Sequence, residues 1–590
     1  MRSQVVDDYQ GRHGELFVRV EIAEGRQTRV ADLAVEGNQQ LTKDELLGVI
    51  GSTQGQPYSD FNISSDRDNI LALYYDQGFS EARFSSDVEQ VPPSDPNEAP
   101  RVRLTYHVIE GRQVLVASVL LGGYEHTRRG VISRQVGIHS GEPLSEGAVV
   151  ETQRKLYNLG IFSRVSIAPQ NAEGDNTRKT VVVMVDEARR YTLAYGLGFE
   201  AQRLGSGATG TGFSAAPRAI LELTKGNLTG RADALSFKVR ASTIQGRALL
   251  AYTAPNYFAS PNFSLQVTAF FEKARNIQTF TSKRYEASLQ LAQRMSSSSS
   301  FLYRYAYRKV NTVLNVSTLT SEQLPLFNQN TDIAEFGASW LRDRRNNPAD
   351  ATRGDFENID LAVAMKPVGS SVDFFRVFLQ NSTYSPIGRR LVFARSTRFG
   401  VQTPYGGTVS TEIPLPERFF AGGGTSLRGF TLNQAGPRDP SSGFPIGGQA
   451  LVVFNQDLRF PMHLPLIGDR LGGAVFYDAG NVFPSVKTIS FRTAPPVPTT
   501  GSTIDAFNHP TTVCLTNCTN ELAYFSHTVG LEFRYGTPIG PVALDLGYQL
   551  NPARFVVQSG TCPATAAAAC QTTLSRLPSF QFFINLGTTF

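Results

Sequence analysis

The stretch FLYRYAYR at residues 301–308 shows the pattern that decides the fold of this chain. Its aromatic side chains occupy alternate positions, namely Phe301, Tyr303, Tyr305 and Tyr307. Arg304 and Arg308 stand between them. A period of two predicts a β-strand with one apolar and one charged face. If the aromatic face met water, the arginines would have to fill a core. We therefore predict that the aromatic face meets lipid and the charged face a lumen.

The same alternation recurs from Tyr191 to the end of the chain, for example in Tyr191–Phe199, Leu235–Arg240 and Phe263–Thr268. We count sixteen such runs, which predicts an all-β, 16-stranded transmembrane β-barrel over residues 191–590. The runs start near residues 191, 215, 231, 244, 262, 283, 300, 332, 355, 372, 389, 447, 470, 524, 540 and 579.

The lengths of the connections agree with this count. If the first strand enters from the inner side of the membrane, the connections after odd-numbered strands face outward. The three longest connections, 400–446, 479–523 and 551–578, all follow odd-numbered strands. The turns after even-numbered strands are shorter, such as 254–262 and 535–541. Short inner turns and longer outer loops are typical of outer-membrane barrels.

Composition excludes several other classes. Of the 590 residues, 18% are charged and 10% aromatic, with 52 Gly and 1 Trp, which favours strands and turns over helices. No apolar run approaches the roughly 18 residues of a spanning helix. The net charge of +5 includes no basic block, so nucleic acid is not an expected partner. The start MRSQVVDDYQ lacks the apolar core of a signal peptide, so we expect the chain to begin inside a larger precursor.

The first 190 residues repeat with a period near 80, typical of a string of small domains. The segment VEIAEG at 20–25 recurs as YHVIEG at 106–111 and more loosely as VMVDEA at 183–188. Each full unit has the pattern strand, helix, helix, strand, strand. We predict the tail of a truncated unit at 1–27, full units at 28–113 and 114–190, and the barrel at 191–590.

Local signals place the helices of the first full unit. Thr42 followed by Glu45 is a capping box, which predicts a helix over Lys43–Ile50. A second helix is predicted to begin near Ser65 and to stop at Gly78.

The four cysteines form two close pairs in polar loops, Cys514 with Cys518 and Cys562 with Cys570. Such spacing predicts local disulfides in an oxidising compartment. A zinc site is the alternative, but it would need the two pairs to converge or a histidine to join them.

The segment FAGGGTSLRGF at 420–430 is the strongest candidate for a functional loop. It lies in a long, Gly-rich connection that a lumen of sixteen strands has room to hold. Asp457 shares a strand face with Asn455 and Arg459, and Asp478 is predicted to end an apolar strand. Arg428 could pair with one or both carboxylates inside the lumen. The alternative is a solvent-exposed arginine in a loose loop.

Together these features resemble the BamA/TamA family of outer-membrane assembly factors. The resemblance rests on the repeats, the barrel, and the motifs FAGGGTSLRGF, NQDLRFP, VFYDAGNVF and FQFFINLGTTF in that order. It implies that the repeats are α+β POTRA domains in the periplasm. It implies that Leu427, Arg428, Gly429 and Phe430 form the family's inward-folded loop motif. Its partner carboxylates are Asp457, where many members carry Glu, and Asp478.

The resemblance also implies a mechanism, in which the first and last barrel strands form a weakly paired lateral gate that templates the strands of unfolded outer-membrane protein clients. The gate residues are Tyr191, Leu193, Tyr195, Phe582, Ile584, the kink glycine Gly587 and Phe590. Periplasmic chaperones, accessory lipoproteins and outer-membrane lipid are the further partners that it implies. No catalytic residue, metal or cofactor is implied, and the expected location is the bacterial outer membrane.

Alternatives remain at several points. A pore of the two-partner secretion type has a similar architecture, and the POTRA repeats could act as spacers rather than client receptors. The client range, broad as in BamA or narrow as in TamA, stays open. The segment GSGATG at 205–210 matches a dinucleotide fingerprint formally, but no helix is predicted to follow it, so we interpret it as a loop.

Overall fold

The structure is a computed structural model. It describes residues 2–7, 17–21, 26–92, 98–202, 214–242, 245–277, 280–314, 330–388, 390–464, 468–504, 510–537, 540–559 and 571–586.

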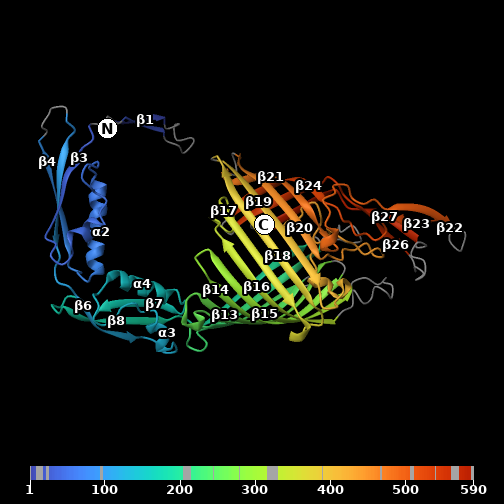
Figure 1. The fold of residues 1–590 in the computed structure, drawn as a ribbon, viewed down its shortest axis with the longest axis horizontal. Coiled ribbons are helices and arrows are strands. Elements are labelled where there is room, and N and C mark those ends of the chain that lie inside the picture. The colour runs from blue at the N-terminus through green and yellow to red at the C-terminus, as the bar shows by residue number, and fades with distance from the viewer. Residues whose placement is uncertain are drawn as a thin grey trace. The chain divides into compact units, whose positions relative to one another are not determined.

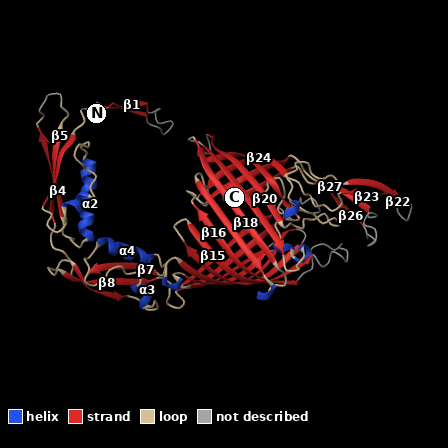
Figure 2. Ribbon diagram, in the orientation of Figure 1, coloured by secondary structure: helices blue, strands red, loops and turns tan. Residues whose placement is uncertain are grey.

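The chain forms two compact units, one of Met1–Arg189 with Thr229–Ala232 and one of Arg190–Leu228 with Asp233–Phe590. All four α-helices of the described residues belong to the first unit, and the large sheet belongs to the second (Figures 1 and 2). The predicted domain limits within these units stay predictions.

Two repeats in the first unit have the predicted order of strand, helix, helix, strand, strand. In each sheet the first strand lies parallel to the last and the middle strand antiparallel to it, in the orders β3-β5-β4 and β6-β8-β7. The elements of the first repeat are β3 Arg29–Glu36, α1 Lys43–Leu47, α2 Asp60–Asp76, β4 Arg83–Val91 and β5 Arg101–Ile109. Those of the second are β6 Leu115–Gly122, α3 Arg129–Ser133, α4 Glu146–Tyr157, β7 Phe162–Pro169 and β8 Arg178–Glu187.

The helix boundaries correct two predictions. The Thr42 capping box is present, but α1 ends at Leu47 because a glycine, a poor helix former, follows it. The second helix begins at Asp60, five residues before the predicted Ser65. Ser59 is extended and supplies the N-cap backbone, and the acidic Asp60 suits the positive end of the helix dipole.

In each repeat, a glutamate at the end of the last strand binds the turn that follows the first strand. These glutamates are Glu110 after β5 and Glu187 at the end of β8. The carboxylate of Glu110 accepts hydrogen bonds from the backbone N–H groups of Gln39 at 2.8 Å and Gln40 at 3.0 Å. The Glu187 carboxylate likewise accepts bonds from the N–H of Thr127 at 2.7 Å and from its hydroxyl at 2.6 Å. These are the glutamates of the repeated segments 106–111 and 183–188, so the sequence repeat marks a shared structural device.

N-terminal to the repeats, β1 Arg2–Asp7 pairs antiparallel with β2 Phe17–Glu21. That this pair is the tail of a truncated POTRA domain stays a prediction.

The second unit contains one antiparallel sheet of sixteen strands, which confirms the predicted barrel. Each strand starts within three residues of its predicted position. The strands are β9 Tyr191–Gln202, β10 Ser214–Gly226, β11 Ala234–Ser242, β12 Gln245–Ala254, β13 Phe263–Ile277, β14 Phe280–Arg294, β15 Ser299–Leu314, β16 Asn330–Asp343, β17 Gly354–Ala364, β18 Phe374–Ile387, β19 Leu391–Pro404, β20 Ala450–Leu464, β21 Gly468–Phe483, β24 Ser526–Thr537, β25 Gly540–Gln549 and β28 Phe580–Leu586.

Short 3₁₀ helices occur in the connections, as η2 Tyr257–Ala259, η3 Lys366–Val368, η4 Ser410–Glu412, η5 Leu415–Glu417 and η6 Val486–Thr488. Among the helices of the described residues, none is long and apolar enough to cross a membrane.

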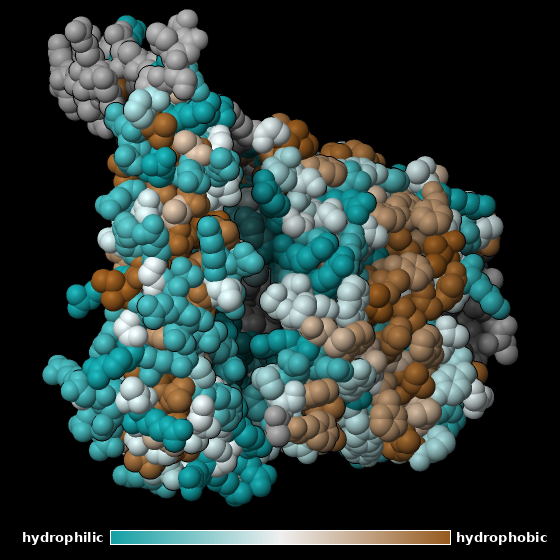
Figure 3. All heavy atoms as spheres, turned by 60° about the vertical axis from the view of Figure 1, so that its left-hand side comes forward, coloured by the Kyte–Doolittle hydropathy of each residue, from teal (hydrophilic) through white to brown (hydrophobic). Residues whose placement is uncertain are grey.

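The strands turn an apolar face outward and a polar face into the lumen. On β15, Tyr303 and Tyr307 are exposed, whereas Arg308 is only 4% exposed. Other strands of the sheet also carry exposed apolar side chains, for example Phe237 on β11 and Leu289 on β14. Figure 3 shows apolar side chains gathered into patches on one face of the molecule. The predicted orientation of the aromatic and arginine faces is thus confirmed.

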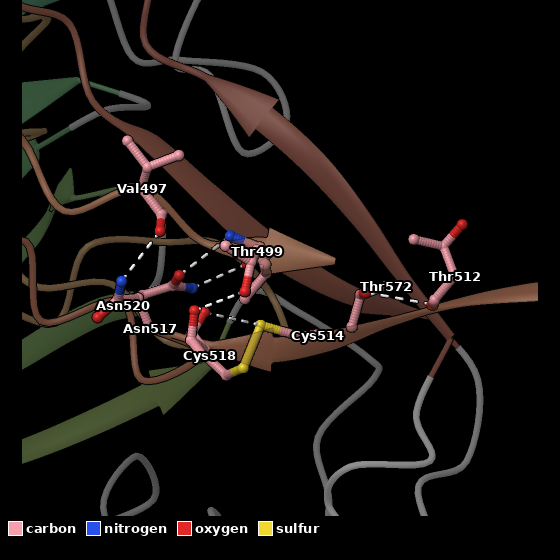
Figure 4. Close-up of a disulfide and its surroundings, with 10 residues drawn as sticks. Val497, Thr499, Thr512, Cys514, Asn517, Cys518, Asn520 and Thr572 are labelled. Carbon is pink, nitrogen blue, oxygen red and sulfur yellow. Dashed lines mark hydrogen bonds between the residues drawn. A yellow bond between two sulfur atoms is a disulfide. The ribbon is translucent and has the colours of Figure 1, made fainter. Parts of the chain in front are cut away.

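Two of the long connections form hairpins, β22 Thr499–Ile504 with β23 Pro510–Thr516, and β26 Arg554–Ser559 with β27 Gln571–Arg576. A disulfide joins Cys514 to Cys518 at the end of the first hairpin (Figure 4). Asn517 lies inside this small loop and donates to the carbonyl of Val497 at 2.9 Å. The predicted pair Cys562 and Cys570 lies outside the described residues.

The charge on Glu187 generates a prediction for the second repeat. Burial raises the pKa of this carboxyl, but bonds from the Thr127 hydroxyl and from three backbone amides lower it further, to about 2 from 4.5. The stabilisation is therefore fully present above pH 4.5 and is lost as the pH falls through about 2. We expect E187Q to lower the free energy of unfolding by roughly 2 kcal/mol at pH 7. We also expect E187Q to flatten the pH dependence between 4.5 and 2.

Urea unfolding of residues 1–189, followed by far-UV circular dichroism, measures both effects. E142Q is the matched control, because Glu142 is exposed and contacts only His139 among the ion pairs of its loop. Equal behaviour of the two variants would contradict the role of Glu187.

Candidate functional site

The connection between β19 and β20, residues 405–449, is here named the inner loop. Its segment 420–430 folds back on itself, and the N–H of Gly423 donates to the carbonyl of Phe430 at 2.9 Å. Gly422 has a φ of +117° and lies so close to the carbonyl of Thr431 that any Cβ would meet it at 2.4 Å. Leu427, Arg428 and Phe430 are buried. The loop is therefore packed inside the barrel, and the exposed-arginine alternative is wrong.

Arg428 and Asp478 of β21 form a two-pronged ion pair. Arg428 Nε donates to Asp478 Oδ2 at 2.8 Å, and Nη2 donates to Oδ1 at 2.7 Å. The backbone N–H of Arg428 also donates to Oδ2, at 3.0 Å. Such a pairing is strong and directional, because the planar guanidinium matches the carboxylate. It fixes both the side chain and the backbone of the loop at this point.

Two further carboxylates complete the site. Arg428 Nη2 donates to Asp457 Oδ1 of β20 at 2.7 Å, so the shorter aspartate reaches the arginine. Nη1 donates to Glu532 Oε2 of β24 at 3.4 Å. All three carboxylates are buried. Arg459 and Arg534, also buried, lie beside Asp457 and Glu532, so three arginines face three carboxylates and no charge of this set is left alone.

An aromatic ring and small residues shape the space for the guanidinium. Arg428 Cζ lies 3.5 Å from the ring centroid of Phe476 on β21, a cation–π contact. A Cβ at Gly530 would meet that ring at 2.2 Å. A Cβ at Gly429 would meet the Thr528 hydroxyl at 2.1 Å. The glycine after the arginine thus allows the loop to lie directly against the wall.

The inner loop has a second anchor of opposite sign at Glu417, in η5. Arg308 of β15 donates to its carboxylate from Nε at 2.9 Å and from Nη2 at 2.6 Å. Arg308 also pairs with Glu335 of β16 at 2.8 Å. Arg376 of β18 lies 3.5 Å from Glu417. Arg428 of the inner loop therefore binds carboxylates on the barrel wall, and Glu417 of the same loop binds arginines on the wall.

The loop also reaches the last strand. The Asn585 amide of β28 donates to the carbonyl of Gly424 at 3.5 Å and to the buried Asp545 of β25. The inner loop therefore contacts one of the two strands predicted to form the gate.

Those two strands stand at the ends of the sheet. The strand order runs from β28 to β9, and among the described residues no ladder joins them. On β9, Tyr195 and Leu197 are 83% and 90% exposed, whereas Leu221 and Leu223 on the neighbouring β10 are 46% and 45% exposed. Of the other predicted gate residues, Tyr191, Leu193, Phe582 and Ile584 are likewise exposed. Gly587 and Phe590 lie outside the described residues.

Several residues of the site were not predicted from the sequence. These are Glu532, Phe476, Glu417 and Asn585. Glu532 and Arg534 are separated by one residue and lie on the polar face of a strand with aromatic residues, which is the same signal that identified Asp457. The sequence does not state which of these charges meet.

The end of one strand corrects a prediction. β21 continues to Phe483, because residues 479–483 pair with 450–454, so Asp478 does not end its strand. In the described part of the chain no group of three or more His, Cys, Asp or Glu could hold a metal ion.

Comparison with protein families agrees with this architecture. Residues 227–590 match the Omp85 superfamily domain. Residues 28–111 and 114–188 match the surface antigen variable number repeat, or POTRA. The chain belongs to the Omp85 superfamily. Its barrel lies in the bacterial outer membrane and its repeats in the periplasm.

Curated relatives carry the names of assembly components. The outer membrane protein assembly factor BamA of Neorickettsia risticii is 23% identical over 72% of this chain and 54% of the relative. BamA of Neisseria meningitidis serogroup B is 22% identical over 92% and 68%. The mouse sorting and assembly machinery component 50 homolog is 24% identical over 64% and 78%. None of these names denotes an enzyme. The chain spans about half of the length of the first of them and about two thirds of the second.

Among solved structures, BamA from Haemophilus ducreyi lacking POTRA domains 1-3 has the same fold. The TM-score is 0.69 at 19% identity, over 94% of this chain and 99% of that one.

The contacts of Arg428 generate a second prediction. R428A would remove the cation that pairs with the buried Asp478 and the nearer of the two arginines beside Asp457, which costs about 3–5 kcal/mol. R428K keeps the charge but cannot bridge both carboxylates and cover the Phe476 ring. We expect both variants to form the barrel and to release the inner loop, so that chymotrypsin cleaves it at Phe420 or Phe430. Heat-modifiable gel mobility reports the barrel, and peptide mapping reports the cleavage.

R395A is the control, because Arg395 is exposed on β19 and its side chain donates to Asn381 of β18 at 3.0 Å. An inner loop that resists cleavage in R428A would contradict the proposed anchor.

Proposed function

We propose that this chain is an outer-membrane β-barrel protein assembly factor, which templates client strands at a lateral gate between β9 and β28. The proposal rests mainly on the two end strands of the sheet, β9 and β28, whose boundary is named the seam. Among the described residues no hydrogen-bonded ladder joins these two strands of an Omp85 superfamily barrel. The names of the curated relatives support the same function.

The physical basis is the unpaired edge. Backbone N–H and C=O groups that face lipid without partners are costly, so a membrane strand with a free edge favours pairing with another strand. On the lumen side of β9, a Cβ at Gly196 or Gly198 would meet no atom within 4 Å, so this strand is open on that face too. An incoming client strand would hydrogen-bond along β9 with little demand on its sequence.

The rest of the barrel is held while the seam opens. The inner loop is tied to β15 and β18 by Glu417 and to β20, β21 and β24 by Arg428. Asn585 adds a weaker tie to β28. Among the described residues β9 shares a ladder with β10 alone, so β9 is the strand that can receive a client without breaking the anchors.

The POTRA repeats would receive the client first. Their sheets expose the outer edges of β4 and β7, which pair on one side only in the described residues. An extended client chain could add to such an edge through backbone bonds. Unfolded outer-membrane proteins are thus the proposed clients, with periplasmic chaperones and accessory lipoproteins as further partners. The driving force is the folding of the client into lipid, and no covalent chemistry is assigned.

Site-specific photo-crosslinking tests where the client binds. With a photoreactive residue at Tyr195 on β9, we expect a stalled outer-membrane protein to crosslink. At Leu289, an exposed position on the outer face in the middle of the sheet, we expect no product. A secretion pore predicts a different result, with crosslinks from lumen positions such as Glu222 and none from Tyr195.

A reversible lock tests whether the seam must open. Cysteines at Leu197 and Ile584, joined by a cleavable bismaleimide in a background with Cys562 and Cys570 replaced by serine, should stop client insertion into vesicles. Insertion should return after reduction. The control lock joins Leu197 to Ala219, which are direct partners of β9 and β10. Full insertion by the seam-locked protein would falsify the gate.

A further inference from the structure

The turn between β16 and β17, residues 344–353, reaches into the lumen from the end of the barrel opposite to the inner loop. It follows an even-numbered strand of the sheet, whereas the inner loop follows an odd-numbered one. Ala351 is fully buried and packs with Tyr384 of β18 and Ala394 of β19. Ala351 therefore anchors this otherwise largely exposed turn to the packed interior, next to the partly exposed Asp350.

One chain of charges runs from this turn to the inner loop. Asp350 Oδ1 lies 3.0 Å from Arg534 Nη2. Arg534 Nε lies 2.9 Å from Glu532 Oε1, an ion-pair contact that lacks hydrogen-bond geometry. Glu532 Oε2 then accepts from Arg428 Nη1 at 3.4 Å. The signs alternate along the chain, so each group stabilises the next.

A second chain runs beside it. The carbonyl of Ala351 accepts a hydrogen bond from Arg459 Nη1 at 3.2 Å. Arg459 Nη2 lies 3.5 Å from Asp457 Oδ2. Asp457 Oδ1 accepts from Arg428 Nη2 at 2.7 Å. Asp350 and Ala351, which are adjacent in the turn, are thus both connected to the Arg428 guanidinium. Asp350 is connected through β24 and Ala351 through β20.

The turn is braced so that it can hold these contacts. The Asn346 carbonyl oxygen Oδ1 accepts from the N–H groups of Thr352 at 3.0 Å and Arg353 at 3.1 Å. Arg344 pairs with Asp355 at 2.7 Å. Gly354 has a φ of +106°, and a Cβ there would meet the Arg344 carbonyl at 2.1 Å. The loop shape is therefore set by its own bonds and not by the charges it presents.

We propose that Asp350 and Ala351 of this periplasmic turn position the Arg428 anchor, so that the turn and the inner loop are coupled across the barrel. Asp350 is a positioning residue that acts through Arg534 and Glu532. When Asp350 is present, Arg534 divides between two carboxylates and leaves Glu532 for Arg428. When Asp350 is removed, Arg534 pairs more fully with Glu532 and draws it away from Arg428, whose contact with Glu532 is the longest of its three ion pairs. The use of this coupling in client assembly rests on the proposed function, but the coupling itself does not.

Hydrogen exchange of the whole chain in lipid, read by mass spectrometry, tests the coupling. In D350A we expect the amides of 421–430 to exchange about 5- to 10-fold faster, as for removal of one contact in a coupled network. The segment 410–418 should not change, because Arg308 holds it independently. D350E should retain the native rates, and D350N should shift them in the same direction as D350A.

D360N is the matched control, because Asp360 is a lumen carboxylate of β17 that pairs with Arg304 and takes no part in either chain. Unchanged exchange at 421–430 in D350A, or equal acceleration in both loop segments, would overturn the proposal. If D350A fails to form the barrel, D350N carries the test, since it keeps the shape of the turn. The measurement contains no client, so failure of the coupling is distinguishable from failure of the assembly function.

Discussion

A guanidinium buried in the barrel lumen must be paired, and much of the interior is arranged around this requirement. An isolated charge in such surroundings costs several kcal/mol. Arg428 is 1% exposed and meets Asp457, Asp478 and Glu532. The requirement extends outward, because each of those carboxylates needs its own neighbours. The pairing consequently joins the loop to β20, which follows it in the sequence, and to the more distant strands β21 and β24.

The anchored part of the barrel thus differs from its edge strand β9. The inner loop holds several wall strands by ion pairs, whereas β9 lies at one end of the sheet. The inner loop is anchored by a cation on one side of the lumen and by the anion Glu417 on the other, with reversed charges on the facing walls. Such anchors resist sliding, since movement of the loop would separate both sets of charges together. Within the described ranges, no ladder joins β9 to β28. In the proposed assembly function, strain from an incoming strand would be taken up at the seam, while the rest of the sheet keeps its register.

The limits of prediction are visible at particular residues. The alternation of Tyr303 and Arg304 is strong enough that strand positions followed from it directly. The Thr42 capping box is a contact over three residues, and it was found where the sequence predicts it. The sequence places the start of α2 too late, because Ser59 and Ser65 are similar local signals. The packing of Ile63 in the core of the repeat favours the earlier start. Arg428 and two of its carboxylates were named from their motifs. Glu532 and Glu417 were not, because their contacts span 104 and 109 residues.

The sequence by itself determined the strands, their two faces and the charges available to the lumen, because the direction of a side chain on a strand depends only on its position along the backbone. Tertiary structure alone decided which charges meet. Closing sixteen strands brings Asp350, Arg534, Glu532 and Arg428 into one line across the lumen, although they come from a turn, a strand and a loop far apart in the chain. Only the folded barrel sets these distances, and the electrostatic energy of each pair depends on the distance between its charges and on their burial.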